Sequence, residues 1–85
     1  MTHRRRLMVD GIVQGVGFRP FVVNLAAGLG LAGFVTNTSD GVVIEVQGPA
    51  GSLDAFTERL STDAPPLAMI LAVTRIDLDP DSGAD

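Results

Sequence analysis

The chain has 85 residues, a formal net charge of −4 and a hydrophobic content of 46%, with no cysteine. A chain of this length holds one domain, and its hydrophobic content excludes general disorder. The lack of cysteine excludes a disulfide framework, a thiolate nucleophile and a zinc ribbon. The basic residues are all arginines, and they do not form the basic stripe that nucleic-acid binding requires: Arg4, Arg5, Arg6, Arg19, Arg59 and Arg75.

The N-terminus has the basic start of a signal peptide, but Asp10 interrupts the apolar stretch that follows. No apolar run approaches the roughly 18 residues of a membrane helix. We therefore expect a cytoplasmic protein that contacts neither membrane nor nucleic acid. We expect one domain over residues 1–85, in which residues 1–5, with His3, and residues 79–85 are flexible tails.

The first half of the chain predicts a strand, a loop and a helix. Apolar residues in Arg6–Val13 favour a strand, and the glycine-bearing loop Gln14–Arg19 follows it directly. Pro20–Leu29 is expected to be a helix, because Pro20 suits a first turn and apolar residues recur at every fourth position, namely Phe21, Leu25 and Leu29. Gly30 is expected to end this helix.

The second half predicts a hairpin, a helix and a last strand. Gly33–Thr38 and Val42–Gln47 are expected to pair through a turn at Ser39–Gly41. Ser52 is expected to cap a helix that runs to about Ser61, with Asp54 in its first turn. Ile70–Leu78 is expected to be a strand, but its pattern does not assign an inward face. The order βαββαβ predicts an α+β ferredoxin-like sandwich, with a four-stranded antiparallel sheet and two helices on one face.

The loop Gln14–Arg19 carries the chemical signal. The first N–H groups of a helix need an acceptor, and neither Phe18 nor Arg19 can provide one. An anion is the natural acceptor, and the guanidinium of Arg19 matches phosphate oxygens. The alternative is a tight turn in which Arg19 forms a surface ion pair. The spacing is neither a dinucleotide-binding G-x-G-x-x-G nor a nucleotide loop that contains lysine.

Two segments resemble the signatures of the acylphosphatase family. Residues 11–19, GIVQGVGFR, are similar to G-x-V-Q-G-V-x-F-R, and residues 33–41, GFVTNTSDG, are similar to G-[FW]-V-x-N-x-x-x-G. Residues 17–22, GFRPFV, and 65–68, PPLA, resemble more narrowly the N-terminal acylphosphatase-like domain of the hydrogenase maturation carbamoyltransferases called HypF.

The resemblance implies a role for each residue of the two segments. Arg19 and Asn37 would be catalytic, with Asn37 holding the attacking water. The phosphate would be bound by Gln14, Gly15, Val16, Gly17, Phe18 and Arg19, mainly through backbone amides. The side chain of Gln14 could touch the ligand, but a hydrogen bond at the end of the strand, to its own loop, is an open alternative. Phe18 and Phe21 are expected to be core residues.

The implied reaction is hydrolysis of an acyl phosphate, with carbamoyl phosphate as the substrate if the narrower resemblance holds. Neither a metal nor a cofactor is implied, and the substrate's own phosphate oxygen would take the proton of the water. The implied partners are downstream domains of the same polypeptide and the hydrogenase maturation protein HypE. Two alternatives stay open, namely a free-standing general acylphosphatase and a catalytically idle module that binds anions.

Overall fold

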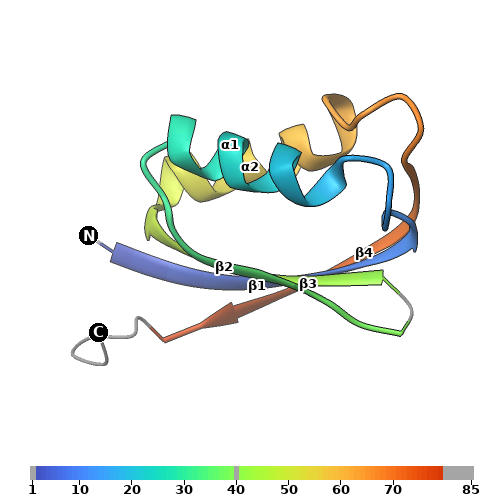
Figure 1. The fold of residues 1–85 in the computed structure, drawn as a ribbon. Helices are drawn as coiled ribbons and strands as arrows, with labels where there is room; N and C mark the ends of the chain where they lie inside the picture. The colour runs from blue at the N-terminus through green and yellow to red at the C-terminus, as the bar shows by residue number, and fades with distance from the viewer. Residues whose placement is uncertain (1, 40, 80–85) are drawn as a thin grey trace.

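The computed structural model describes residues 2–39 and 41–79. The elements follow the predicted order and are β1 Thr2–Ile12, α1 Phe18–Gly28, β2 Ala32–Asn37, β3 Gly41–Pro49, α2 Ala50–Thr62 and β4 Met69–Leu78. The strands form one four-stranded sheet in the order β2-β3-β1-β4, and every neighbouring pair is antiparallel. Both helices cover the same face of this sheet (Figure 1). The prediction of a ferredoxin-like sandwich is confirmed.

The topology brings two distant segments together at one end of the sheet. Strands β1 and β2 are both antiparallel to β3, which lies between them. They therefore run parallel to each other, and their C-terminal ends lie at the same end of the sheet. The loop that follows Ile12 and the turn that follows Asn37 therefore lie side by side. Gly41 faces Asp10 of β1 in the register, and Val42 faces Asn37 of β2.

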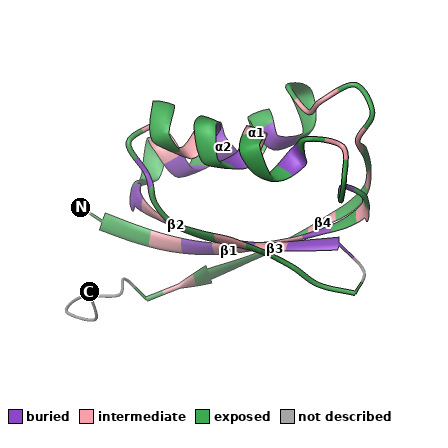
Figure 2. Cartoon of the chain, viewed as in Figure 1, coloured by how far each residue is buried: buried purple, intermediate pink, exposed green. Residues whose placement is uncertain are grey.

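The core lies between the sheet and the two helices, and Figure 2 colours the buried residues purple on these elements. Alternate residues of β1 and β3 point toward the helices, as a half-buried sheet requires. The core residues are Leu7, Val9, Val13, Phe18, Val22, Leu25, Leu31, Val42, Ile44, Val46, Leu53, Phe56 and Leu60. Burial of Phe18, and packing of Phe21 against this cluster, confirm both rings as core residues.

The N-terminal segment belongs to the sheet, so the expectation of a flexible tail over residues 1–5 is wrong from Thr2 onward. His3 pairs with Gly48 of β3 in the register. The side chain of Arg5 is buried and contacts Asp77 of β4 at 2.9 Å and Asp54 of α2 at 3.2 Å. The arginine in this segment, which was expected to lie in a flexible tail, is thus held by carboxylates that are distant in the sequence. The other tail, residues 79–85, falls outside the described residues from position 80 onward.

Both helices begin before the predicted residue. Helix α1 starts at Phe18, two positions before Pro20, because Gly17 adopts the left-handed conformation that precedes it. Helix α2 starts at Ala50, so Ser52 is not its cap, and Pro49 leads directly from β3 into the helix. Helix α1 ends as predicted: Gly30 has φ 72°, and the Leu31 N–H donates to the Ala26 carbonyl at 2.9 Å. Among the described residues, no helix is long and apolar enough to cross a bilayer.

Strand β4 has no clear alternation because its register shifts. Asp10 faces Ala72 and Gly11 faces Ile70, so Leu71 is an extra residue opposite β1. A bulge of this kind changes which residues face the core. Ile70 and Val73 therefore both pack against it although they are three positions apart. This explains why the sequence pattern did not assign an inward face.

Candidate active site

The loop between β1 and α1 forms an open cradle of backbone amides. Gly15 and Gly17 have φ values of 73° and 83°, a left-handed conformation that glycine adopts at little cost. Gly17 is the N-cap of α1, and no side chain caps this helix. The first intrahelical bond runs from the Phe21 N–H to the Gly17 carbonyl at 3.2 Å. The helix thus begins with uncapped N–H groups, as predicted.

These amides are available to an external acceptor. Across residues 2–39 and 41–79, no hydrogen bond occupies the backbone N–H groups of residues 15–19. Pro20 has no N–H, so the helix start needs no protein acceptor at that position. Helix dipole and free donors both favour an anion at this point.

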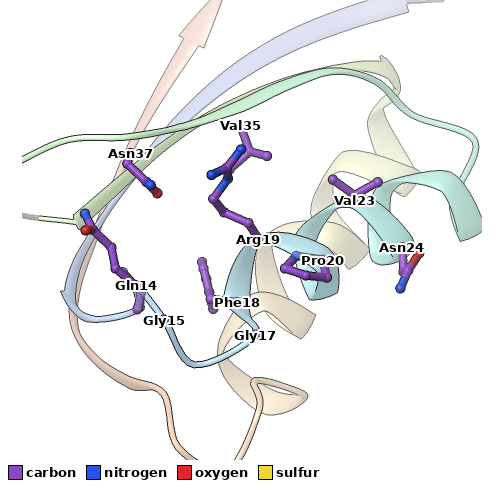
Figure 3. Close-up of a pocket in the computed structure, with 11 residues that line it drawn as sticks. Gln14, Gly15, Gly17, Phe18, Arg19, Pro20, Val23, Asn24, Val35 and Asn37 are labelled. Atoms are coloured by element: carbon purple, nitrogen blue, oxygen red, sulfur yellow. The ribbon is translucent and has the colours of Figure 1, made fainter.

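Arg19 is distinct from the other arginines of the chain. Each of the other five forms an ion pair with Asp or Glu. Within the part of the chain that the structure describes, Arg19 has no such partner. Its side chain reaches from the first turn of α1 toward β2, where the guanidinium lies beside Val35 (Figure 3). The alternative interpretation, in which Arg19 forms a surface ion pair, is not supported, because no described carboxylate pairs with Arg19.

Asn37 faces the same space from the opposite side. It lies at the end of β2, two residues after Val35, and its register with Val42 puts it on the helix-covered face. Figure 3 shows its side chain pointing between Arg19 and the glycine loop. Asn37 is exposed, and its side chain has no hydrogen-bond partner among the described residues. The structure therefore brings together the two residues that the sequence predicted as catalytic.

A pocket of about 610 Å³ connects these groups. The predicted site residues that line it are Gln14, Gly15, Gly17, Phe18, Arg19 and Asn37, whereas Val16 is not part of the lining. Among the described lining residues Arg19 carries the one charge, and none is a carboxylate. The pocket is therefore positive although the chain is acidic, and an anion would enter it without repulsion from its walls.

Sequence reasoning missed part of the pocket wall. Val23, Asn24 and Val35 also line it. Val23 lies four residues after Arg19 on α1, and Val35 lies two residues before Asn37 on β2. Helical and strand periodicity from the two predicted catalytic residues could have found Val23 and Val35.

Gln14 braces the two loops of the site. Its side-chain Nε2 donates to the carbonyl of Thr38 at 2.7 Å and to the carbonyl of Gly41 at 2.9 Å. The sequence left open whether the Gln14 side chain contacts the ligand or forms a hydrogen bond within the protein. The structure shows the hydrogen bond, but its acceptors are Thr38 and Gly41 rather than residues of its own loop. Both amide protons are used, so contact with phosphate would fall to its backbone N–H.

No general base or metal cluster lies in the described part of the site. His3 and Asp10 are in β1, and neither lines the pocket; Asp40 lies outside the described residues. Among residues 2–39 and 41–79, no three His, Asp or Glu side chains gather in a way that could hold a metal ion. The arrangement offers donors that fix an anion and an amide that can orient a water molecule.

Comparison with known proteins identifies the family. The acylphosphatase family model matches residues 5–85. Carbamoyltransferase HypF2 of Cupriavidus necator is 59% identical over 69 residues, which cover 81% of this chain and 9% of that protein. The structure of full-length HypF in its phosphate- and nucleotide-bound form superposes with a TM-score of 0.93 at 36% identity, covering 100% of this chain and 11% of that one.

A free-standing enzyme matches as well. The crystal structure of acylphosphatase from Bacillus subtilis superposes with a TM-score of 0.84 at 37% identity, and the match covers 98% of this chain and 91% of that one. The chain thus spans about a tenth of the carbamoyltransferases and nearly the whole length of this acylphosphatase. The chain belongs to the acylphosphatase family.

Proposed function

We propose that the chain hydrolyses acyl phosphates by gripping the phosphoryl group and orienting a water molecule. The observation that carries this proposal is that backbone amides, the Arg19 guanidinium and the Asn37 side chain converge on one pocket and have no partner among the described residues. Hydrogen bonds to a charged group contribute roughly 1.5–3 kcal/mol each, so this set is sufficient to hold a small dianion.

In the proposed reaction, the amides of residues 15–19 and the guanidinium of Arg19 hold the phosphoryl oxygens. Such donors stabilise the transition state because they are fixed before charge redistributes. The side-chain amide of Asn37 orients a water molecule toward the phosphorus atom. The water oxygen forms a bond to phosphorus, the bond from phosphorus to the acyl oxygen breaks, and the carboxylate or carbamate leaves with that electron pair. A phosphate oxygen of the substrate takes the proton of the water.

We further propose carbamoyl phosphate as the substrate and the cytoplasm as the setting. The 59% identity to carbamoyltransferase HypF2 supports this choice. In this proposal the chain is one domain, and the carbamate passes to downstream domains of a larger polypeptide. There it is activated with ATP toward the cyanide ligands of nickel–iron hydrogenase, with the maturation protein HypE as a partner.

Phosphate release from carbamoyl phosphate and from a generic acyl phosphate tests the proposal. We expect Arg19→Gln to lower kcat/KM by about 10²-fold or more, because a charged donor to the transition state is lost. Asn37→Ala should lower kcat by about 10²-fold with little change in phosphate affinity. Arg59→Gln removes an exposed arginine of α2 that pairs with Asp63, and it is the matched control with unchanged activity. Full activity of Arg19→Gln would end the proposed mechanism.

A general acylphosphatase is the second candidate. The match over 91% of the Bacillus subtilis enzyme favours it, because that protein is similar to this chain almost from end to end. Comparable kcat/KM values for carbamoyl phosphate and a larger acyl phosphate would support this candidate. A strong preference for carbamoyl phosphate would support the first. Binding of phosphate without any hydrolysis would indicate the anion-binding module instead.

A further inference from the structure

We propose that the Gln14 side chain is a positioning residue that holds Asn37 in register with the phosphate loop. Its Nε2 atom donates to the carbonyls of Thr38 and Gly41, at 2.7 and 2.9 Å. Gln14 is the first residue of the phosphate loop, and Thr38 directly follows Asn37. One side chain therefore joins the segment that carries the amide cradle to the segment that carries the proposed water-orienting residue.

The chemistry fixes the orientation of this carboxamide. Both acceptors are carbonyl oxygens, so only the NH₂ end of Gln14 can face them, and the opposite rotamer would place three oxygens together. Both of its protons are then engaged. The side chain of Gln14 is thus committed to the β2–β3 turn, although the residue itself is exposed.

The turn that Gln14 contacts is itself closed by local hydrogen bonds. The Thr38 N–H donates to the Gly41 carbonyl at 2.9 Å, and the Gly41 N–H donates to the Thr38 hydroxyl oxygen at 3.0 Å. These bonds join Thr38 to Gly41, and the two bonds from Gln14 hold both of these residues. However, β2 is an edge strand and pairs with β3 alone, so its end has no second neighbouring strand to hold it. Gln14 supplies that second attachment.

The kinetic consequence follows from where Asn37 lies. The amide cradle and Arg19 belong to the β1–α1 segment, so they keep their places when Gln14 loses its hydrogen bonds. Asn37 belongs to the segment that is released. We therefore expect catalysis to suffer and phosphate binding to persist, because a displacement of about 1 Å in a positioned group can cost up to about 10²-fold in rate.

The variant Gln14→Met tests this role, because methionine has a similar length but no donor. We expect a loss of about 10-fold in kcat, with the inhibition constant of inorganic phosphate within about two-fold of wild type. The matched control is Gln47→Met on β3, where another hydrogen-bonded glutamine lies away from the pocket. In the Asn37→Ala background, Gln14→Met should have no further effect on kcat, since a residue that acts through Asn37 cannot act without it.

A second variant guards against a folding defect in the first. Gln14→Glu keeps the size but replaces the donor by an oxygen that repels both carbonyls while it is ionised. When the carboxyl is protonated it can donate one of the two bonds. The activity of this variant relative to wild type should therefore rise as the pH falls, whereas that of Gln14→Met should not. Equal pH profiles of the two variants would overturn the proposal.

The kinetic experiments rest on the proposed function. A structural experiment therefore tests the positioning role of Gln14 separately from that function. NMR spectra of the wild type and of Gln14→Met should differ at the Asn37 side-chain amide and at the backbone amides of Thr38 and Gly41, and the Gln47→Met control should not differ there. If the wild type hydrolyses no acyl phosphate, the proposed function fails, and unchanged Asn37 signals in Gln14→Met would independently refute the brace. Three other results would overturn the positioning role of Gln14. They are a kcat of Gln14→Met equal to that of the wild type, losses in kcat that add up in the Gln14→Met, Asn37→Ala double variant, and phosphate inhibition of Gln14→Met that weakens as much as kcat falls.

Discussion

At the scale of single residues, the left-handed backbone of Gly17 both starts helix α1 and shapes the wall of the candidate active site. Its φ of 83° ends the loop and starts α1, and a Cβ added there would meet nothing within 4 Å. Gly17→Ala thus creates conformational strain without a clash, and we expect it to lower the free energy of unfolding by about 1–2 kcal/mol. Because relaxation of this residue re-aims the N–H groups, phosphate affinity should fall as well. Urea unfolding and phosphate titration measure the two effects.

Gly41 is the contrasting case for this prediction. A Cβ on Gly41 would overlap the carbonyl oxygen of Val9, so the pairing of β3 with β1 would have to shift. Gly41→Ala should therefore impair the fold far more than Gly17→Ala. A larger loss of stability in the Gly17 variant would contradict this assignment of roles.

At the scale of elements, Arg5 joins three of them. From β1 it donates to Asp77 of β4 at 2.9 Å and to the Thr57 hydroxyl of α2 at 2.9 Å, and it pairs with Asp54 of α2 at 3.2 Å. The arginine side chain is 6% exposed, whereas the two carboxylates are 65% and 62% exposed. Removal of the arginine leaves both carboxylates exposed to water, and Asp77 keeps its ion pair with Arg75. Removal of the carboxylates leaves a buried guanidinium without its charged partners.

This asymmetry predicts the order of two variants. Arg5→Met keeps the apolar stem and should lower the midpoint of urea unfolding only slightly. The double variant Asp54→Asn, Asp77→Asn should lower it more, because an uncompensated buried charge is costlier than two exposed carboxylates. Arg59→Gln, which breaks an exposed pair between α2 and Asp63, the residue that follows this helix, serves as the control. The reverse order would show that the network contributes through attraction rather than through the cost of burial.

The sequence predicted every element, and each error in an element's bounds or inward face has an identifiable physical cause. The strand signal began at Arg6 because three consecutive arginines do not alternate in the way a half-buried strand does, yet Arg5 is buried by partners from β4 and α2 that local sequence cannot reveal. The bulge at Leu71 disrupted the alternation of β4 in the same way. Arg19 and Asn37 were predictable because each is marked by a short motif. The two bonds of Gln14 were not, since they span 24 and 27 residues.

At the scale of the whole molecule, ion pairs connect stability to pH. The carboxylate of Glu45 lies on the sheet face away from the helices and binds Arg4 at 3.0 Å and Arg6 at 2.9 Å. Partial burial raises the pKa of Glu45, but hydrogen bonds and charge from Arg6 and Arg4 together outweigh it, so the pKa lies below the ordinary 4.5. The hydrogen bond from Arg5, followed by that from Arg75, holds the pKa of Asp77 below the ordinary 3.8.

The sign of the pH dependence follows from these directions. Each group binds fewer protons in the folded than in the unfolded state over the acid range, so the free energy of unfolding rises with pH. Its contribution is present in full above the ordinary pKa values of 4.5 and 3.8 and is lost as the pH falls through the lowered ones. We expect Tm to be level near neutrality and to decline below about pH 5. Glu45→Gln should flatten this decline, whereas Glu58→Gln, which removes an exposed carboxylate of α2, should leave it unchanged. If Tm declines equally steeply below about pH 5 in both variants, the Arg4–Glu45–Arg6 cluster does not contribute to the pH dependence. The decline would then arise from other carboxylates.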